Sequence, residues 1–406
     1  MNWLSVSRKS GRLSKRSLMM PDPFNNPPSR LQTRSVKWDY LRDVFGVDSL
    51  IPAWVADMDF PAPASVQEAL TTRVAHGIYG YSRCPQELKS LIVQWYQRYH
   101  AVTLLPEWLI YCPFGVVSAM GFCLQALLNK DQAVVVMPPV YPPLFNQPTQ
   151  MGYSVLRSPL RHENNEWSMD LAHLAQLCQT TPVAMVSLCS PHNPVGRVWR
   201  REELLELAAL QKKYGFLVFS DEIHSDFLMP GFTHSPYFSL GEEAALRSIV
   251  FHAPNKTFNL AGCASSYIII PDPQLRRKVA QTIEPYGFHD GNVLSQQALA
   301  SAYRDGHDWL AELKEVLFQN YTDLRAALKD SCYRPSATEG TYLSWIDCSA
   351  LADSPEVIRK RLLTEAQVGL DDGVKFGPGG AGYQRLNFAC APQTLREITT
   401  RMLKLG

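Results

Sequence analysis

Residues 183–224, VAMVSLCSPHNPVGRVWRREELLELAALQKKYGFLVFSDEIH, contain two short apolar runs separated by one helical pattern. The runs 183–189 and 216–220 are rich in β-branched, aromatic and other apolar residues, which is typical of strands buried on both faces. Between them, residues 201–214 place apolar side chains at helical spacing. This alternation predicts an α/β domain with a largely parallel sheet.

The same alternation extends outward in both directions. Further strand-like runs lie at 109–112, 133–137, 248–252 and 267–270, and 85–99 is an amphipathic helical segment. From about Asn292 the character changes to long helical patterns, at 294–304, 307–328, 354–366 and 393–405. One strand-like run at 341–347 and a glycine-rich loop at 377–382 interrupt them. The C-terminal part therefore predicts a second, smaller α+β domain.

Composition excludes several classes of protein. The 406 residues include 39 Lys and Arg against 38 Asp and Glu, so the net charge of +1 argues against a nucleic-acid binder. With 46% hydrophobic residues the bulk of the chain is not disordered, and no apolar run is long enough for a membrane helix. The nine cysteines are scattered and form no C-x-x-C pair, which favours reduced thiols in the cytoplasm and no metal site.

The first twenty residues depart from this charge balance. They carry five basic residues and no acidic one, without the apolar stretch of a secretory signal. We expect a flexible tail over residues 1–30. A transit peptide, or a true start at Met19 or Met20, is the alternative reading of this segment.

Residues that directly follow the predicted strands are candidates for a ligand site, because ligands of open α/β sheets bind at the carboxyl ends of the strands. Gly115 follows 109–112 and opens a helix, whose free N–H groups can bind an anion. Tyr141 is held among prolines after 133–137, and Asn193 lies between two prolines after 183–189. Each also has a simpler interpretation, as a turn glycine, a rigid surface turn and a turn asparagine.

Three chemically distinctive residues follow the next strands. Asp221 ends a buried strand, where a carboxylate is costly unless it is paired, and a protonated heterocyclic nitrogen is a suitable partner. His224 follows it, and Lys256 lies in a short polar loop after 248–252. In a low-dielectric site the pKa of a lysine amine falls and the amine becomes a nucleophile. The simpler readings are a helix N-cap, a hydrogen-bonded histidine and a solvated lysine.

Taken together, these residues form the set that holds pyridoxal 5′-phosphate. The N–H groups near Gly115 suit the phosphate, and Tyr141 suits the ring. Asn193 suits the phenolic oxygen, Asp221 the pyridinium nitrogen and Lys256 the aldehyde.

These segments resemble the fold-type I pyridoxal-phosphate enzymes within the class I and II aminotransferase family, specifically the MalY/PatB-like cystathionine β-lyases and C–S lyases. Seven segments carry the resemblance, from about residue 35 to the C-terminus: WVADMDF at 54–60, GY at 80–81, PVYPP at 139–143, PHNPVGR at 191–197, DEIH at 221–224, KTFNLAG at 256–262 and RLN at 385–387. The resemblance implies the aspartate-aminotransferase fold, with a mostly parallel seven-stranded sheet in a large domain (61–292). A small α+β domain would comprise 31–60 and 293–406.

The resemblance also implies roles for individual residues. Lys256 and Tyr141 would be catalytic. The cofactor contacts would come from Gly115, Val116, Val117, Tyr141, Asn193, Asp221, His224, Asn255, Lys256 and, across a homodimer interface, Tyr81. The substrate would bind to Arg385, Asn193, Tyr141 and Asp57, with Arg385 clamping its carboxylate. His224 stands where many aminotransferases have tyrosine, as is usual in the lyases, and Asn255 stands where the lyases more often have serine.

The expected reaction is α,β-elimination on cystathionine or another cysteine S-conjugate, giving a thiol, pyruvate and ammonia. Transamination of an amino acid uses the same residues and is the first alternative. A regulatory protein that keeps the cofactor and some lyase activity is the second. We expect an amino-acid substrate, and neither nucleic acid nor membrane as a partner.

Overall fold

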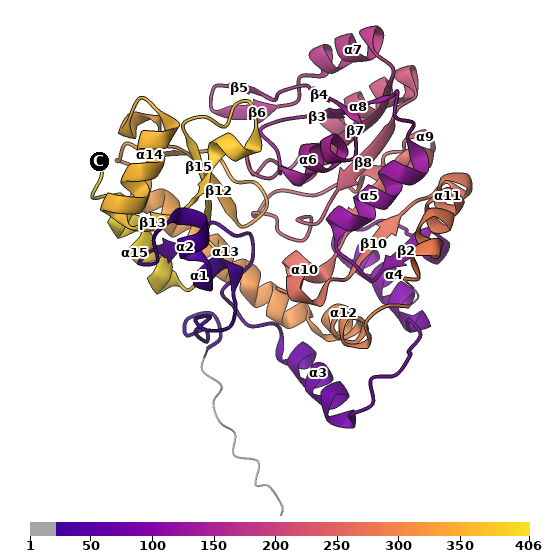
Figure 1. The fold of residues 1–406 in the computed structure, drawn as a ribbon, viewed down its shortest axis with the longest axis horizontal. Coiled ribbons are helices and arrows are strands. Elements are labelled where there is room, and N and C mark those ends of the chain that lie inside the picture. The colour runs from indigo at the N-terminus through magenta and orange to yellow at the C-terminus, as the bar shows by residue number, and fades with distance from the viewer. Residues whose placement is uncertain (1–21, 289) are drawn as a thin grey trace, which may run out of the picture.

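A seven-stranded sheet forms the centre of the computed structural model, which describes residues 22–288 and 290–406 (Figure 1). The strand order is β2-β10-β9-β8-β7-β3-β4. Its strands are β2 (Leu109–Cys112), β3 (Ala133–Val136), β4 (Ser154–Arg157), β7 (Val183–Cys189), β8 (Leu217–Asp221), β9 (Ser248–His252) and β10 (Ser266–Ile269). Strand β10 is antiparallel to both of its neighbours, and the other pairs are parallel. The mostly parallel seven-stranded sheet is thus confirmed.

Six of the seven strands coincide, within one residue at their ends, with the apolar runs read from the sequence. The seventh, β4, was not among those runs. It pairs only with β3 at the edge of the sheet, and Ser154 and Arg157 at its ends are exposed. The sequence of β4, SVLR, has a polar residue at each end of two apolar ones, so it lacks the continuous apolar run that revealed the others.

Alternate residues of the strands supply two apolar layers, one on each face of the sheet. Val134 and Val136 pack in one cluster with helices α5 (Val116–Leu127), α6 (Pro143–Gln150) and α11 (Pro273–Ile283). Val135 packs in the other cluster with α4 (Gln86–His100), α7 (Leu171–Thr180) and α8 (Arg201–Tyr214). Because successive side chains of a strand point to opposite faces, these apolar strands require helices on both sides.

A second, four-stranded antiparallel sheet has the order β11-β12-β15-β14. Its strands are β11 (Arg334–Pro335), β12 (Leu343–Asp347), β14 (Asp371–Asp372) and β15 (Tyr383–Asn387), and helices α13 (His307–Leu328), α14 (Pro355–Arg361) and α15 (Pro392–Met402) accompany it. Strand β15, which carries Arg385, was not predicted as a strand. The helix expected over 354–366 ends at Arg361, where a π-helical turn (Leu362–Ala366) replaces its last part.

The N-terminal segment lies beside the C-terminal part of the chain (Figure 1). Helices α1 (Val36–Asp39) and α2 (Leu41–Phe45) precede β1 (Ile51–Pro52), which pairs in parallel with β13 (Val368–Gly369). Residues 1–21 of the expected tail lie outside the described residues. Residues 22–30 correct that expectation, because Phe24 is buried and Arg30 forms an ion pair with Asp57. The domain boundaries at 60/61 and 292/293 stay predictions.

The remaining elements connect these layers. They are α3 (Ala64–His76), β5 (Arg161–Glu163), β6 (Glu166–Ser168), α9 (Glu242–Leu246), α10 (Pro254–Thr257), α12 (Val293–Asp305) and several 3-10 turns. Helix α12 packs against α3. Within 22–288 and 290–406, none of the helices combines the length and the apolar character needed to cross a bilayer.

Candidate active site

A cavity of about 200 Å³ lies where β7, β8 and β9 end and α5 and α10 begin. Nine residues predicted from the sequence line it: Gly115, Val116, Val117, Tyr141, Asn193, Asp221, His224, Asn255 and Lys256. They gather there because the carboxyl ends of parallel strands share one edge of the sheet. Ala56, Ser118, Cys189, Ile223 and Ala261 complete the lining.

Lys256 carries the amine of the site. It lies on α10, directly after β9, and its Nζ donates a hydrogen bond to the carbonyl oxygen of Ala56. Burial, followed by the charge of Arg385, lowers the pKa of Lys256 to about 8, although Asp57 and Asp221 act in the opposite direction. A substantial fraction of the amine is therefore neutral, and nucleophilic, near physiological pH.

Asp221 is the last residue of β8, and its side chain is 6% exposed. Among the described residues, the one hydrogen bond to its carboxylate comes from the N–H of Ile223, 3.2 Å from Oδ1. Burial raises the pKa of Asp221 to about 6, against the opposing effects of that hydrogen bond and of Lys256. A carboxylate in this position favours a cationic partner such as a protonated ring nitrogen.

The first turn of α5 supplies an anion-binding site. Gly115 is its N-cap, and no side chain caps the helix. The N–H groups of Val116 and Val117 precede the first intrahelical bond, in which Ala119 donates to the carbonyl of Gly115. Unpaired N–H groups and the helix dipole attract a phosphate to such a terminus. Nearby, the buried Oδ1 of Asn255 has no hydrogen-bond partner among the described residues.

Arg385 and Asn193 are held together beside the cavity. Arg385 Nη1 donates to Asn193 Oδ1 at 2.9 Å, and its Nη2 donates to the Trp54 carbonyl at 2.9 Å and to Asp371 Oδ2 at 2.8 Å. Since Oδ1 of Asn193 accepts from the guanidinium, its Nδ2 remains as the donor toward an oxygen in the cavity. The Tyr141 N–H donates to the Asn193 carbonyl at 3.0 Å, which fixes the two loops relative to each other.

Two aromatic groups of the cavity are uncharged. Burial, helped by the charges of Lys256 and Arg385, lowers the pKa of His224 well below its ordinary value, so its imidazole is neutral. Its buried Nδ1 has no partner within the described part of the chain. Burial and the nearby Asp221 raise the pKa of Tyr141, so its phenol stays protonated.

Three predicted site residues do not line this cavity: Arg385, which is held beside it by Asn193, and Tyr81 and Asp57, which lie elsewhere. Tyr81 is fully exposed on its own chain and lines a separate surface groove with Tyr79. Asp57 lines a neighbouring pocket, where Arg30 donates to its carboxylate at 2.9 Å and 2.6 Å. The charge of Asp57 nevertheless raises the pKa of Lys256.

Sequence reasoning missed three contributors. Ala56 carries the carbonyl that accepts from Lys256, Tyr342 donates to the same oxygen at 3.0 Å, and Asp371 pairs with Arg385. Ala56 lies inside the WVADMDF segment, so that motif was the available signal. Tyr342 lies in the strand-like run 341–347, but nothing in that run indicates a contact with Ala56, and Asp371 lies in no predicted element. The packing of the second sheet brings both to the site.

The chain is similar to a known protein family, to curated proteins and to solved structures. Residues 56–402 match the family model for aminotransferase class I and II. Cystathionine beta-lyase PatB of Bacillus subtilis is 39% identical, over 93% of this chain and 98% of that protein. Cystalysin of Treponema denticola, solved with pyridoxal 5′-phosphate, has a TM-score of 0.90 at 29% identity, over 94% of this chain and 98% of its own. A pyridoxal-phosphate-bound protein of Clostridium difficile 630 has a TM-score of 0.91 at 34% identity, over 94% and 99%. The chain has the aspartate-aminotransferase fold and belongs to the aminotransferase class I and II family.

Proposed function

We propose that the cavity binds pyridoxal 5′-phosphate and that the protein is a carbon–sulfur β-lyase acting on cystathionine or related cysteine S-conjugates. The observation that carries this proposal is that one cavity contains both a buried lysine amine, with its pKa lowered to about 8, and a buried carboxylate. PatB supports the activity by its name, and the structures from Treponema and Clostridium support the cofactor by theirs.

The residues present fit this cofactor. Lys256 would hold it covalently through Nζ, and Asp221 would hold the protonated ring nitrogen. The N–H groups of Val116 and Val117 would hold the phosphate, with the amide of Asn255 beside them. Asn193 would donate to the phenolic oxygen. Among the buried side-chain atoms without a partner in the described residues, Asn255 Oδ1 and His224 Nδ1 belong to residues that line this cavity, where a polar ligand could bond to them.

When bound, pyridoxal phosphate supplies an electron sink that stabilises negative charge at the substrate Cα. The chain supplies the rest. Arg385 would bind the α-carboxylate, and Lys256 Nζ, released when the substrate amine takes its place, would remove the proton from Cα. Tyr141, whose phenol is protonated, can donate its proton to the departing sulfur. With cystathionine and one water molecule, the products are homocysteine, pyruvate and ammonia.

The decisive experiment uses the holoenzyme with cystathionine and S-alkyl cysteines, in the absence of any 2-oxo acid. We expect thiol and pyruvate in equal amounts. Amino transfer that requires an oxo-acid acceptor would show instead that the protein is an aminotransferase, the activity that its family also includes.

The cofactor assignment has its own test. Borohydride should fix pyridoxal phosphate to Lys256, as located by peptide mapping, and Lys256→Ala protein should take up no label. A label on another lysine would overturn the assignment of Lys256 while leaving the lyase test independent.

We further propose that the protein is a homodimer in which Tyr81 reaches the phosphate of the neighbouring site. Tyr81 and Tyr79 are exposed beside one groove, and Tyr286 and Phe288 are exposed aromatics as well. Such aromatic exposure is typical of an interaction surface. Residence in the cytoplasm stays a prediction.

Mixing two inactive variants tests this arrangement. Lys256→Ala and Tyr81→Ala chains, unfolded and refolded together, should regain roughly a quarter of the native sites, because mixed dimers rebuild one complete site each. Each variant refolded alone is the control. No recovery in the mixture, with dimers shown by light scattering, would place Tyr81 outside the site.

A further inference from the structure

The amine of Lys256 is tied to residues 53–60, which form neither helix nor strand between β1 and α3. The carbonyl of Ala56, within this 53–60 segment, accepts hydrogen bonds from Lys256 Nζ and from the Tyr342 hydroxyl. Tyr342 is fully buried. Since Ala56 contacts the reactive amine, the position of the 53–60 segment affects the direction in which that amine points.

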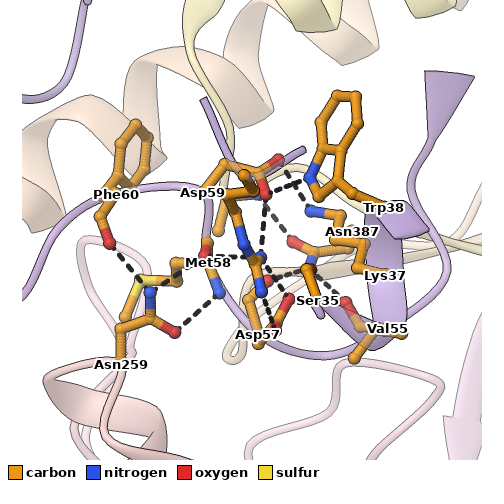
Figure 2. Close-up of polar contacts among 12 residues, drawn as sticks. Ser35, Lys37, Trp38, Val55, Asp57, Met58, Asp59, Phe60, Asn259 and Asn387 are labelled. Carbon is orange, nitrogen blue, oxygen red and sulfur yellow. Dashed lines mark hydrogen bonds and ion pairs between the residues drawn. The ribbon is translucent and has the colours of Figure 1, made fainter. Parts of the chain in front are cut away.

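A buried ionic cluster fixes the far end of the 53–60 segment. The carboxylate of Asp59 accepts from Lys37 Nζ at 2.8 Å, from Trp38 Nε1 at 2.8 Å and from Arg30 Nη1 at 3.0 Å (Figure 2). The Lys37 side chain is 0% exposed, so this pair is not screened by water. The segment is therefore anchored to the N-terminal part of the chain, independently of Lys256.

Asn259 joins residues 254–263, which carry Lys256 and are called the lysine loop below, to the anchored 53–60 segment. Its Oδ1 accepts from the Met58 N–H at 3.1 Å, and its Nδ2 donates to the carbonyls of Met58 at 2.9 Å and Phe60 at 2.8 Å (Figure 2). Its backbone has φ 57°, a left-handed conformation that asparagine tolerates better than most residues. Within the described residues, the hydrogen bonds between 254–263 and 53–60 come from Lys256 and Asn259.

We propose that Asn259 is a positioning residue for Lys256, which it serves by holding the Ala56 carbonyl opposite the lysine amine. Two points of attachment, three residues apart on the lysine loop, fix both the distance and the register between the loop and the 53–60 segment. Without Asn259, the amine makes the one remaining hydrogen bond between 254–263 and 53–60 among the described residues. Tyr342 still donates to Ala56, and Asn387 still donates to the carbonyls of Val55 and Asp57 on either side of it.

The consequence concerns the lone pair of the amine. A neutral amine that donates one N–H to Ala56 O turns its lone pair away from that carbonyl. The lone pair is then available to the cavity, where a base for the substrate Cα is needed under the proposed function. The same bond stabilises the protonated amine, since a hydrogen bond from a charged donor is stronger than one from a neutral donor.

The test begins with Asn259→Gly, which removes all three side-chain bonds while suiting the left-handed backbone. The experiment uses full-length protein freed of cofactor. Mass spectrometry measures the rate at which a small amine-reactive reagent modifies Lys256, over a range of pH. We expect the midpoint of this pH profile to fall below the wild-type value by roughly 0.5–1 pH unit, because the Ala56 carbonyl is no longer held opposite the protonated amine. An unchanged or raised midpoint would overturn the proposal.

Two further variants separate side-chain bonding from backbone strain. Asn259→Ala loses the same bonds and adds left-handed strain, so it should show the same midpoint as Asn259→Gly with a lower melting temperature. Asn164→Gly is the matched control, since Asn164 has φ 51° in the exposed turn between β5 and β6 and should leave the midpoint unchanged. A merely structural role for Asn259 would lower the melting temperature without moving the midpoint.

The holoenzyme provides a second measurement. With S-methylcysteine, Asn259→Gly should lower kcat about 3- to 10-fold and change KM less, because Arg385 still holds the carboxylate. A change confined to KM would contradict positioning of the base. If the wild-type protein released no pyruvate, the lyase proposal would fail, while the midpoint of Lys256 would still test Asn259.

Discussion

Asp221, the last residue of β8, and Asp226, five residues further along the chain, are both buried, at 6% and 2% exposure. Their pKa values nevertheless move in opposite directions. Burial raises the pKa of Asp221 to about 6, whereas hydrogen bonding and neighbouring imidazoles hold the pKa of Asp226 well below its ordinary value despite burial. The difference lies in the donors that each carboxylate receives.

Asp226 receives two side-chain hydrogen bonds and has two imidazoles nearby. Its carboxylate accepts from Thr257 Oγ1 at 2.6 Å and Trp95 Nε1 at 3.0 Å, and the imidazoles of His100 and His252 lie 3.7 Å and 3.6 Å away. Asp221 receives one backbone N–H in the described structure. Burial alone thus does not distinguish a structural carboxylate from a functional one, whereas the number of donors does.

The largest effect on stability should come from removing the carboxylate of Asp226, which receives more donors than that of Asp221. Asp226→Ala leaves the donors of Trp95 and Thr257 without an acceptor and should lower the free energy of unfolding by about 3–5 kcal/mol. Denaturant titration of protein freed of cofactor measures it. Asp221→Ala is the matched control and should change stability little or raise it, so equal losses in both variants would break the comparison.

For catalytic activity we expect the opposite, with the larger loss on changing Asp221. Asp221→Asn removes the charge facing the ring nitrogen and should lower kcat/KM for pyruvate release by about 10²–10³. The fold should persist, because an amide is cheaper to bury than an unpaired carboxylate. Near-wild-type activity in this variant, with full cofactor occupancy, would show that Asp221 does not act on the ring.

The two residues also predict opposite pH dependences of stability. The folded-state pKa of Asp221, about 6, exceeds its ordinary 3.8, so the folded state binds more protons and stability falls as pH rises from about 4 to about 6. The difference corresponds to up to roughly 3 kcal/mol. For Asp226 the contribution is complete above 3.8 and is lost as pH falls below it.

Thermal melts of protein freed of cofactor, between pH 4 and pH 7, measure this dependence. The difference between wild type and Asp221→Asn isolates the first residue, since all other groups titrate in both proteins. Parallel curves across this range would show that Asp221 is ionised at the same pH in the folded and unfolded chains.

Arg385 is an intermediate case, because it is buried and well bonded but keeps one unpaired donor, Nε, among the described residues. Arg385→Ala should raise KM for the best amino-acid substrate by about 10- to 100-fold, as expected for charged hydrogen bonds of about 1.5–3 kcal/mol. Arg385→Lys keeps the charge without the fork and should recover only part of the loss. Steady-state kinetics measure these KM values, and an unchanged KM would show that another residue binds the substrate carboxylate.

Much of this site could be read from the sequence because its key residues directly follow strands that sequence patterns reveal. Asp221 and Lys256 come after apolar runs, and parallel strands place such positions along one edge. Asn259 and Tyr342 could not be assigned this way, because their roles depend on contacts with the irregular 53–60 segment. Asp226 was not singled out from the sequence, since the donors around it come from distant parts of the chain.

The bonding of Arg385 has a consequence for how the site selects its ligands. Asn193, Trp54 and Asp371 already accept from its guanidinium, and Nε is its unpaired donor among the described residues, so under the proposed function an incoming carboxylate would exchange with part of these bonds. The net affinity is then a difference between two sets of bonds of similar strength. Under that proposal, esters and amides, as weaker acceptors than a carboxylate, would compete less well with Asp371 for the guanidinium, so the existing bonds of Arg385 would contribute to selectivity for a free carboxylate.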